Sequence, residues 1–210
     1  MPHIGFAQHA KRPIAVAAIV AAVTLPFAAR GEPAAPTCDA PLSMTRFTNA
    51  LVRVAQRLKS GEPITVVAIG SSSTAGTGAS SSATSYPSRL EVELTRRFPG
   101  HPITVLNRGV GGEEIGDMLE RFDTDVIATK PDLVLSQFGT NSVIRDDKLN
   151  NHNVAIREGL TKIRSTGADI VLIDPQFAPK VIVKPEATRM VELIASTAKR
   201  EMSTFSPALM

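Results

Sequence analysis

Serine, glycine and asparagine gather in three short segments of the sequence that could together carry out acyl transfer. The first segment contains Gly70 and Ser72, the second contains Gly111 and Gly112, and the third contains Asn141. A serine hydroxyl can attack an ester carbonyl, and glycine N–H groups or an asparagine amide can stabilise the oxyanion that forms. Taken singly, however, a serine-rich turn more often caps a helix, a glycine pair forms a turn, and an asparagine can cap a helix.

The serine-rich first segment does not match three better-known motifs that also use glycine and serine. A Walker A loop has four residues between its glycines and then a lysine, but five residues separate Gly70 from Gly76 and no lysine follows. A dinucleotide fingerprint needs glycine where Ser81 stands, and an esterase G-x-S-x-G motif needs glycine where Thr74 stands. A phosphate- or nucleotide-binding α/β protein is therefore a disfavoured alternative.

The elements that must position these segments alternate along the chain. Short, mainly apolar runs predict strands covered on both faces, at 64–69, 103–106, 133–138 and 170–173. Helical spacing of apolar residues predicts helices near 42–60, 87–98, 115–128, 153–165 and 186–199. This alternation predicts an α/β fold, a three-layer α/β/α doubly wound parallel sheet. Ligands of such sheets bind beyond the carboxyl ends of the strands, which places the three segments at one edge.

In this order, the three segments resemble the conserved blocks of the SGNH/GDSL hydrolase family. Residues 70–76 are similar to the family's G-D-S-x-x-x-G block, with Ser71 in place of aspartate. Residues 107–113 are similar to its N-x-G-x-x-G-[DE] block, and residues 139–142 to its G-x-N-D block, with Ser142 in place of aspartate. The resemblance covers roughly 63–183 and implies a flavodoxin-like sheet.

The resemblance implies a role for each candidate site residue. Ser72 would be the nucleophile, and its main-chain N–H, that of Gly112 and the side-chain amide of Asn141 would form the oxyanion hole. Ser71 and Ser73 are the alternative nucleophiles. Three further glycines would shape the turns rather than touch substrate: Gly76, Gly109 and Gly139.

The implied activity is that of a serine esterase that hydrolyses an acyl or acetyl ester of a small molecule, polysaccharide or lipid. No metal or organic cofactor is implied. The family's general base and its orienting group come from a late D-x-x-H block, which this sequence lacks: its histidines are His3, His9, His101 and His152. His152 is at the correct edge of the predicted sheet and is a weak substitute, and a helix-capping role is expected for Asp174.

The C-terminal region leads us to expect an incomplete domain. After the helix predicted at 186–199, a further strand and the D-x-x-H block would follow in the family, and we expect both to be missing here. We hypothesise that the reading frame is lost or truncated near residue 200, which resequencing the DNA through codons 195–215 would test. The alternative function is then a catalytically impaired remnant, or a pseudoenzyme that binds an ester or a carbohydrate.

The N-terminus has the pattern of an export signal. Two cations precede an apolar stretch at 13–29, so we interpret 1–30 as a secretory signal peptide, 31–41 as a linker and 42–210 as the hydrolase domain. An uncleaved membrane anchor is the alternative. If the signal peptide is cleaved, the protein would contact the membrane only transiently, during export to the periplasm or the exterior.

Charge and cysteine content exclude two other classes of protein. Of 23 Lys+Arg residues, three lie in the first 30 positions, which leaves 20 against 20 Asp+Glu in the rest of the chain. Nucleic-acid binding is therefore not expected, because it needs a clustered basic excess. The single cysteine, Cys38, excludes an intrachain disulfide framework.

Overall fold

One parallel sheet forms the centre of the protein. The computed structural model describes residues 47, 49–147, 151–201 and 204–206. Within these ranges the strand order is β2-β1-β3-β4-β5, and every neighbouring pair is parallel. The strands are β1 (Ile64–Gly70), β2 (Ile103–Gly109), β3 (Leu133–Gln137), β4 (Asp169–Ile173) and β5 (Thr204–Ser206). This order, with β1 inside the sheet, is that of a doubly wound fold, and the predicted fold class is confirmed.

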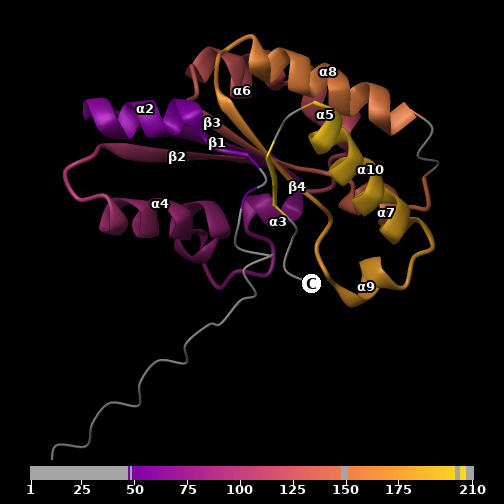
Figure 1. Ribbon diagram of the computed structural model, residues 1–210. Helices are drawn as coiled ribbons and strands as arrows, with labels where there is room; N and C mark the ends of the chain where they lie inside the picture. Colours follow the sequence, from indigo (N-terminus) through magenta and orange to yellow (C-terminus); the bar gives the residue numbers. More distant parts are fainter. Residues whose placement is uncertain (1–46, 48, 148–150, 202–203, 207–210) are drawn as a thin grey trace, which may run out of the picture. The chain divides into compact units, whose positions relative to one another are not determined.

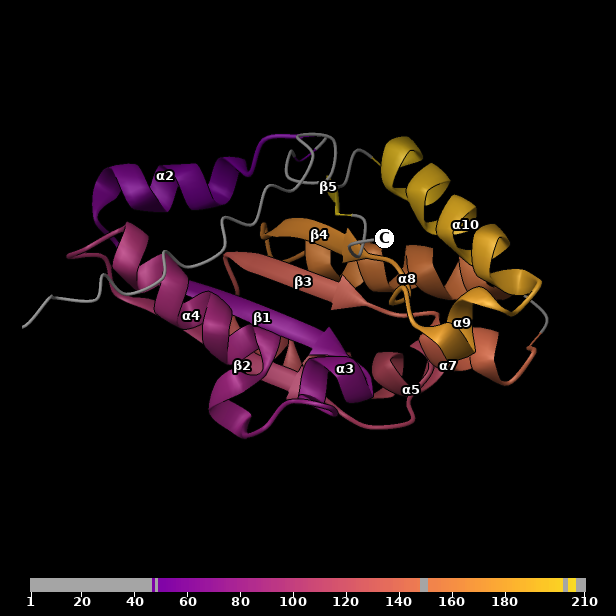
Figure 2. The same cartoon turned by 90° about the horizontal axis from the view of Figure 1, so that it is seen from below.

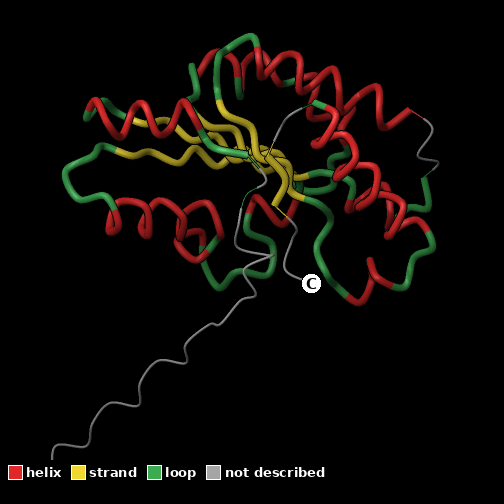
Figure 3. Tube along the Cα trace, viewed as in Figure 1, coloured by secondary structure: helices red, strands yellow, loops and turns green. Residues whose placement is uncertain are grey.

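Helices alternate with the strands along the chain, as Figure 3 shows. The helices are α2 (Val52–Ser60), α3 (Ser72–Ala75), α4 (Tyr86–Arg97), α5 (Ile115–Glu120), α6 (Phe122–Asp125), α7 (Thr140–Ile144), α8 (His152–Arg164), α9 (Pro179–Ile182) and α10 (Glu186–Arg200). Short 3₁₀ turns occupy Ser82–Thr84 and Ile127–Thr129. Helices α8 and α10 lie on the side of the sheet opposite α4 (Figure 1), and α4 lies over β1 and β2 (Figure 2).

Two apolar cores separate the three layers, one on each face of the sheet. Val67 and Ile69 of β1 face the core shared with α5, α6, α8 and α10, whereas Val66 and Ala68 face the core shared with α2 and α4. Side chains of a strand alternate between faces, so a strand covered on both faces is mainly apolar on both. This explains why the predicted strands are mainly apolar runs.

The helix predicted at 42–60 is shorter in the structure. Positions 42–46 and 48 lie outside the described residues, and positions 49–51 are not helical, so α2 begins at Val52. The reason is a tertiary cap: the Val54 N–H donates to the Asp169 carboxylate at 2.9 Å. A carboxylate from another element satisfies an N–H of the first turn and thereby fixes the start of the helix.

The single helix predicted at 115–128 is wrong. The structure has α5, then a break at Arg121, then α6 and a 3₁₀ turn. Arg121 has φ −109° and ψ 6°, outside the helical range, and its side chain is engaged with the loop before α5. The apolar spacing persists through the break because Met118 and Phe122 both enter the same core.

The expectation that no strand follows the last helix is also wrong. Residues 204–206 form β5, which pairs with β4 in parallel, with Leu172 opposite Phe205. A three-residue strand is too short for its alternation to be recognised in sequence, and its pairing extends the sheet beyond β4. No D-x-x-H sequence follows β5 in the 210 residues.

An apolar groove of about 610 Å³ lies on the sheet face between α2 and α4. Its walls include Val66 of β1, Leu135 of β3, Leu58 of α2 and Leu90 of α4. These strand residues belong to the face of the sheet and not to its carboxyl edge. The groove is therefore distinct from the loops that carry the candidate site.

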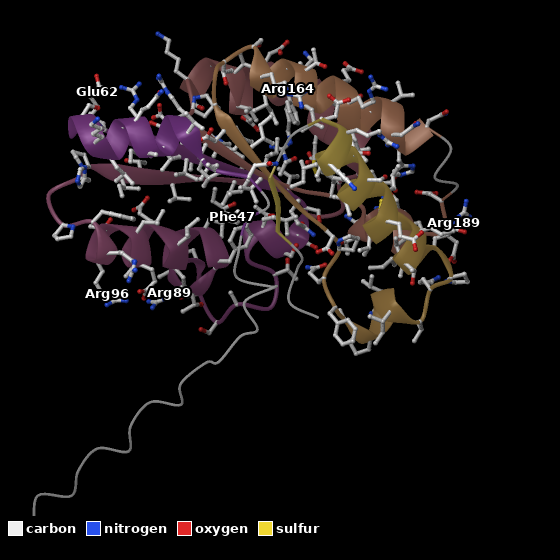
Figure 4. All side chains as sticks on the ribbon, in the orientation of Figure 1. Phe47, Glu62, Arg89, Arg96, Arg164 and Arg189 are labelled. Atoms are coloured by element: carbon white, nitrogen blue, oxygen red, sulfur yellow. The ribbon has the colours of Figure 1, made fainter. Side chains whose placement is uncertain are left out.

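Surface charges are mostly paired. Arg89 and Arg96 extend from the outer side of α4, where both pair with Glu93 (Figure 4). Arg189 pairs with Glu186 on α10. These exposed pairs balance the local charge and each adds little stability.

The chain divides into two compact units, Met1–Cys38 and Asp39–Met210, and every described residue belongs to the second. The predicted signal peptide at 1–30, the linker at 31–41 and Cys38 lie outside the described residues. No helix in the described ranges is both long enough and apolar enough to cross a bilayer.

Candidate active site

The three segments singled out in the sequence meet at the carboxyl edge of the sheet. Ser72 begins α3 after β1, Gly111 and Gly112 follow β2, and Asn141 lies in α7 after β3. A Cβ placed on Gly111 would be 3.8 Å from the Ser72 Cβ, so the first two segments are in contact. The Asn141 Nδ2 donates to the Glu113 main-chain oxygen at 2.7 Å, which joins the third segment to the second. The structure thus brings together all the predicted site residues.

Two glycines allow α3 to lie directly on the ends of β1 and β2. A Cβ on Gly70 would be 2.1 Å from the Thr74 hydroxyl, and a Cβ on Gly109 would be 2.1 Å from the Ala75 nitrogen. Any side chain at either position would push α3 away from the sheet. Gly76 ends α3 with φ +108°, a left-handed conformation that favours glycine.

The three neighbouring serines have different surroundings. Ser71 is buried, and the Ser73 hydroxyl donates to Gln137 Oε1 at 2.9 Å. Ser72 is half-buried, and within the described part of the chain its side chain forms no hydrogen bond. Ser72 is therefore the one whose hydroxyl is both accessible and uncommitted.

A hydrogen-bonded series of buried and half-buried polar side chains, called here the polar chain, lies behind Ser72 and Asn141. From Ser73 it continues through Gln137, whose Nε2 donates to the Thr140 hydroxyl at 3.1 Å, and that hydroxyl donates to Gln176 Oε1 at 3.0 Å. Gln137 and Thr140 are both almost fully buried. This polar chain connects the immediate neighbours of Ser72 and Asn141. The sequence pattern did not reveal it.

The glycine loop after β2 is held by two arginines. Arg145 Nη2 donates to the Gly112 main-chain oxygen at 2.8 Å, and its Nη1 pairs with Glu114. The Arg121 guanidinium binds the Glu113 carboxylate with its Nε at 2.9 Å from each oxygen. Burial alone would lower the pKa of Arg121, but its hydrogen bonds to the carboxylates of Glu113 and Asp125 raise it above the ordinary value. The guanidinium therefore stays charged.

No described histidine acts as a partner of the Ser72 hydroxyl. His101 precedes β2, at the amino edge of the sheet, and packs against the Phe98 ring with a centroid distance of 6.5 Å. His152 begins α8 and is not hydrogen-bonded to Ser72. His3 and His9 lie outside the described residues. The arrangement therefore places a serine hydroxyl next to a glycine loop and an asparagine amide, while neither described histidine is hydrogen-bonded to that hydroxyl.

A small cleft of about 260 Å³ follows β4 at the same edge of the sheet. Buried Asp174 and half-buried Gln176 contribute polar atoms, and Phe177, Val181 and Val191 contribute apolar ones. Gln176 reaches Thr140, which precedes Asn141, so the cleft adjoins the polar chain. Among the described residues, no group of three or more His, Cys, Asp or Glu side chains is arranged to hold a metal ion.

The sheet order and the three loops at its carboxyl edge define a hydrolase of the SGNH/GDSL-like class. Residues 37–206 match the non-GDSL lipase-like family. The match covers well over half of the chain, and the chain therefore belongs to this family.

Solved structures with the same fold agree with this assignment. TesA has 21% identity and a TM-score of 0.60, over 67% of this chain and 76% of TesA. A lipolytic protein assigned to the G-D-S-L family, from Desulfitobacterium hafniense DCB-2, has 26% identity and a TM-score of 0.59, over 68% and 76% of the two chains. The acetylxylan esterase Axe2 from Geobacillus stearothermophilus has 22% identity and a TM-score of 0.57, over 68% and 74%. No curated protein matches the sequence.

Proposed function

We propose that the chain is an exported ester hydrolase in which Ser72 is the nucleophile. The Ser72 oxygen attacks the ester carbonyl carbon, the alcohol leaves with a proton, and water then releases the acid from the acyl-serine. The N–H groups of Ser72 and Gly112 and the Asn141 amide stabilise the oxyanion of each tetrahedral intermediate. The substrate is an acyl or acetyl ester of a small molecule, polysaccharide or lipid.

The observation that carries this proposal is the contact between an uncommitted serine and the glycine loop. The Ser72 Cβ is 3.8 Å from the Cβ position of Gly111, and Asn141 is hydrogen-bonded to the same loop. Oxyanion donors must lie about 3 Å from the developing charge, which requires a nucleophile and donors on adjacent loops. Family membership supports the same chemistry.

Hydrolysis of p-nitrophenyl acetate by the purified chain tests the proposal. We expect Ser72→Ala to lower kcat/KM to the background rate, and Ser165→Ala, at the end of α8, to leave it unchanged. Mass spectrometry should find a fluorophosphonate adduct on Ser72 and on no other serine. Equal rates for the original chain and Ser72→Ala would contradict the proposal.

A second candidate function is a pseudoenzyme that binds an ester or a carbohydrate without hydrolysing it. The observation that favours it is that neither described histidine is hydrogen-bonded to Ser72. Loss of the base lowers turnover by about 10⁴–10⁶ while binding survives. Calorimetry with an acetylated xylo-oligosaccharide separates the two functions: binding without a Ser72-dependent rate supports the pseudoenzyme.

The proposal of export rests on the sequence at 1–30. Two cations precede an apolar stretch, which is the pattern that secretion machinery recognises. A fusion of residues 1–41 to an alkaline phosphatase that is active only outside the cytoplasm should be active, and Val20→Arg should abolish that activity. N-terminal sequencing of the secreted protein would separate a cleaved signal from an anchor. An active Val20→Arg fusion would contradict export by this segment.

A further inference from the structure

The Arg121 guanidinium contacts the ends of β1 and β2 and the Glu113 side chain of the glycine loop. Arg121 lies at the break between α5 and α6, and its Nε and Nη2 both bind the Glu113 carboxylate. Its Nη2 also donates to the Arg108 main-chain oxygen at 2.9 Å and lies 3.5 Å from the Gly70 oxygen. Arg121 therefore connects the ends of β1 and β2 with the loop that follows β2.

These contacts are made to neighbours of the residues that the proposed reaction uses. Gly70 is two residues before Ser72, and Glu113 directly follows Gly112. The Glu113 main-chain oxygen accepts the hydrogen bond from the Asn141 amide. A shift of Glu113 would therefore move the Gly112 N–H and the Asn141 amide together, relative to Ser72.

We propose that Arg121 is a positioning residue, which holds the Gly112 N–H and the Asn141 amide at the distance from Ser72 that oxyanion stabilisation requires. This inference rests on the proposed function. Arg121 does not touch the substrate, because its donors are occupied by Glu113, Asp125 and two main-chain oxygens.

The geometry explains why arginine is needed at this position. Its planar fork binds the two oxygens of Glu113 and still reaches Asp125 and the strand ends, whereas a lysine ammonium is a point charge on a flexible stem. Both side chains of the pair are mostly buried, at 16% exposure for Arg121 and 14% for Glu113. Arg121→Lys thus keeps the charge and loses the simultaneous contacts.

The chain offers a matched control at the opposite edge of the sheet. Arg57 also binds two acids, Asp132 at 2.8 Å and Glu62 at 2.7 Å, but it joins α2 to the amino ends of the strands. Arg57→Lys should destabilise the fold without moving the glycine loop. A comparison of Arg121→Lys with Arg57→Lys therefore separates positioning from general stability.

The experiment measures kcat and KM for p-nitrophenyl acetate, together with Tm, for the full chain and both variants. We expect Arg121→Lys to lower kcat by about 10–100-fold with KM changed by less than about twofold, because small misplacements of catalytic groups cost this much. Arg57→Lys should lower Tm and leave kcat unchanged. A double variant, Arg121→Lys with Glu113→Gln, should be no slower than the slower single variant, since both remove one contact. Equal loss of kcat in the two arginine variants at equal loss of Tm would overturn the inference.

Amide hydrogen exchange provides a second test of the inference, which does not depend on catalysis. If the original chain is no faster than Ser72→Ala, the proposed function fails, and the inference is then decided by exchange alone. We expect Arg121→Lys to accelerate exchange in segments 70–76 and 109–114, and Arg57→Lys to leave both unchanged. Unchanged exchange of these segments in Arg121→Lys would overturn the inference.

Discussion

The main chain of Gly109 lies against the main chain of Ala75, so that a Cβ on Gly109 would be 2.1 Å from the Ala75 nitrogen. Main-chain atoms have no flexible end that could move aside, and real Cβ atoms are never this close to them. The end of β2 is therefore the surface on which α3 rests. Because α3 carries Ser72, the height of the candidate nucleophile above the sheet depends on the absence of a side chain at position 109.

We expect Gly109→Ala to destabilise the fold by about 2 kcal/mol and to lower kcat more than it raises KM, because overpacking forces the backbone to shift. Urea unfolding and p-nitrophenyl acetate kinetics measure the two effects. Gly116→Ala in α5 is the matched control, because a Cβ there meets nothing within 4 Å. Alanine in a helix should be neutral or stabilising at position 116. Equal kinetics for the two variants would show that α3 tolerates displacement.

We expect Asn141→Ala to lower kcat by about 10²–10³ with little change in KM, because it removes a proposed oxyanion donor. It also removes the 2.7 Å hydrogen bond to the Glu113 oxygen. Asn141→Asp should be slower still, since a carboxylate repels both that oxygen and the oxyanion. Asn153→Ala, on the exposed side of α8, is the control. If Asn141→Ala instead raised KM alone, the amide would bind the ground state and not the transition state.

Much of the fold could be predicted from the sequence because the inner strands of the sheet are buried on both faces. The runs at 64–69, 103–106, 133–138 and 170–173 are mainly apolar, and each coincides with a strand. The ends of the predicted strands then indicated that Ser72, Gly112 and Asn141 would meet at one edge of the sheet. The structure places them at that edge. Parallel sheets allow this inference because all their carboxyl ends lie at one edge.

The contacts that the sequence did not reveal are tertiary contacts that local spacing does not predict. Asp169 caps α2 from 115 positions away, and nothing in the local sequence at 49–54 marks the start of that helix. Glu113 and Arg121 lie before and after α5, eight residues apart, a spacing that predicts no contact. Such contacts form only when the sheet is assembled, so periodicity cannot indicate them.

We expect Gln137→Met to destabilise the protein by about 2 kcal/mol, because the Ser73 hydroxyl loses its acceptor and the buried Thr140 hydroxyl keeps only its bond to Gln176. The effect on kcat should be larger than that of an equally destabilising change elsewhere, since these hydroxyls adjoin Ser72 and Asn141. Adding Ser73→Ala to Gln137→Met should cost less than the sum of the two single changes, which urea unfolding can measure. Strict additivity would show that the polar chain does not act as a unit.

The last prediction concerns acid stability and Asp132, which lies at the amino edge of the sheet. Burial by itself would raise the pKa of Asp132, but the Thr65 N–H at 3.0 Å and the Arg57 guanidinium at 2.8 Å lower it below its ordinary value. The unfolded chain titrates this group near pH 4, at about 3.9. A carboxylate whose pKa is lower in the folded state adds stability that is complete above the unfolded pKa and is lost as the pH falls through the folded pKa.

We therefore expect Asp132→Asn to cost about 3 kcal/mol at pH 7, because it leaves Arg57 and Arg53 without their buried partner. The difference in free energy of unfolding between the original chain and Asp132→Asn should be constant above about pH 5 and should shrink as the pH falls from about 4 toward 2. Glu62→Gln is the control, because Glu62 also pairs with Arg57 but is 55% exposed. Its effect should be much smaller at every pH, since solvent screens an exposed pair. Urea unfolding from pH 2 to pH 7 measures the effects of both substitutions. If the free-energy difference between the original chain and Asp132→Asn stayed constant over this range, the Asp132 carboxylate would have the same pKa in the folded and unfolded chain.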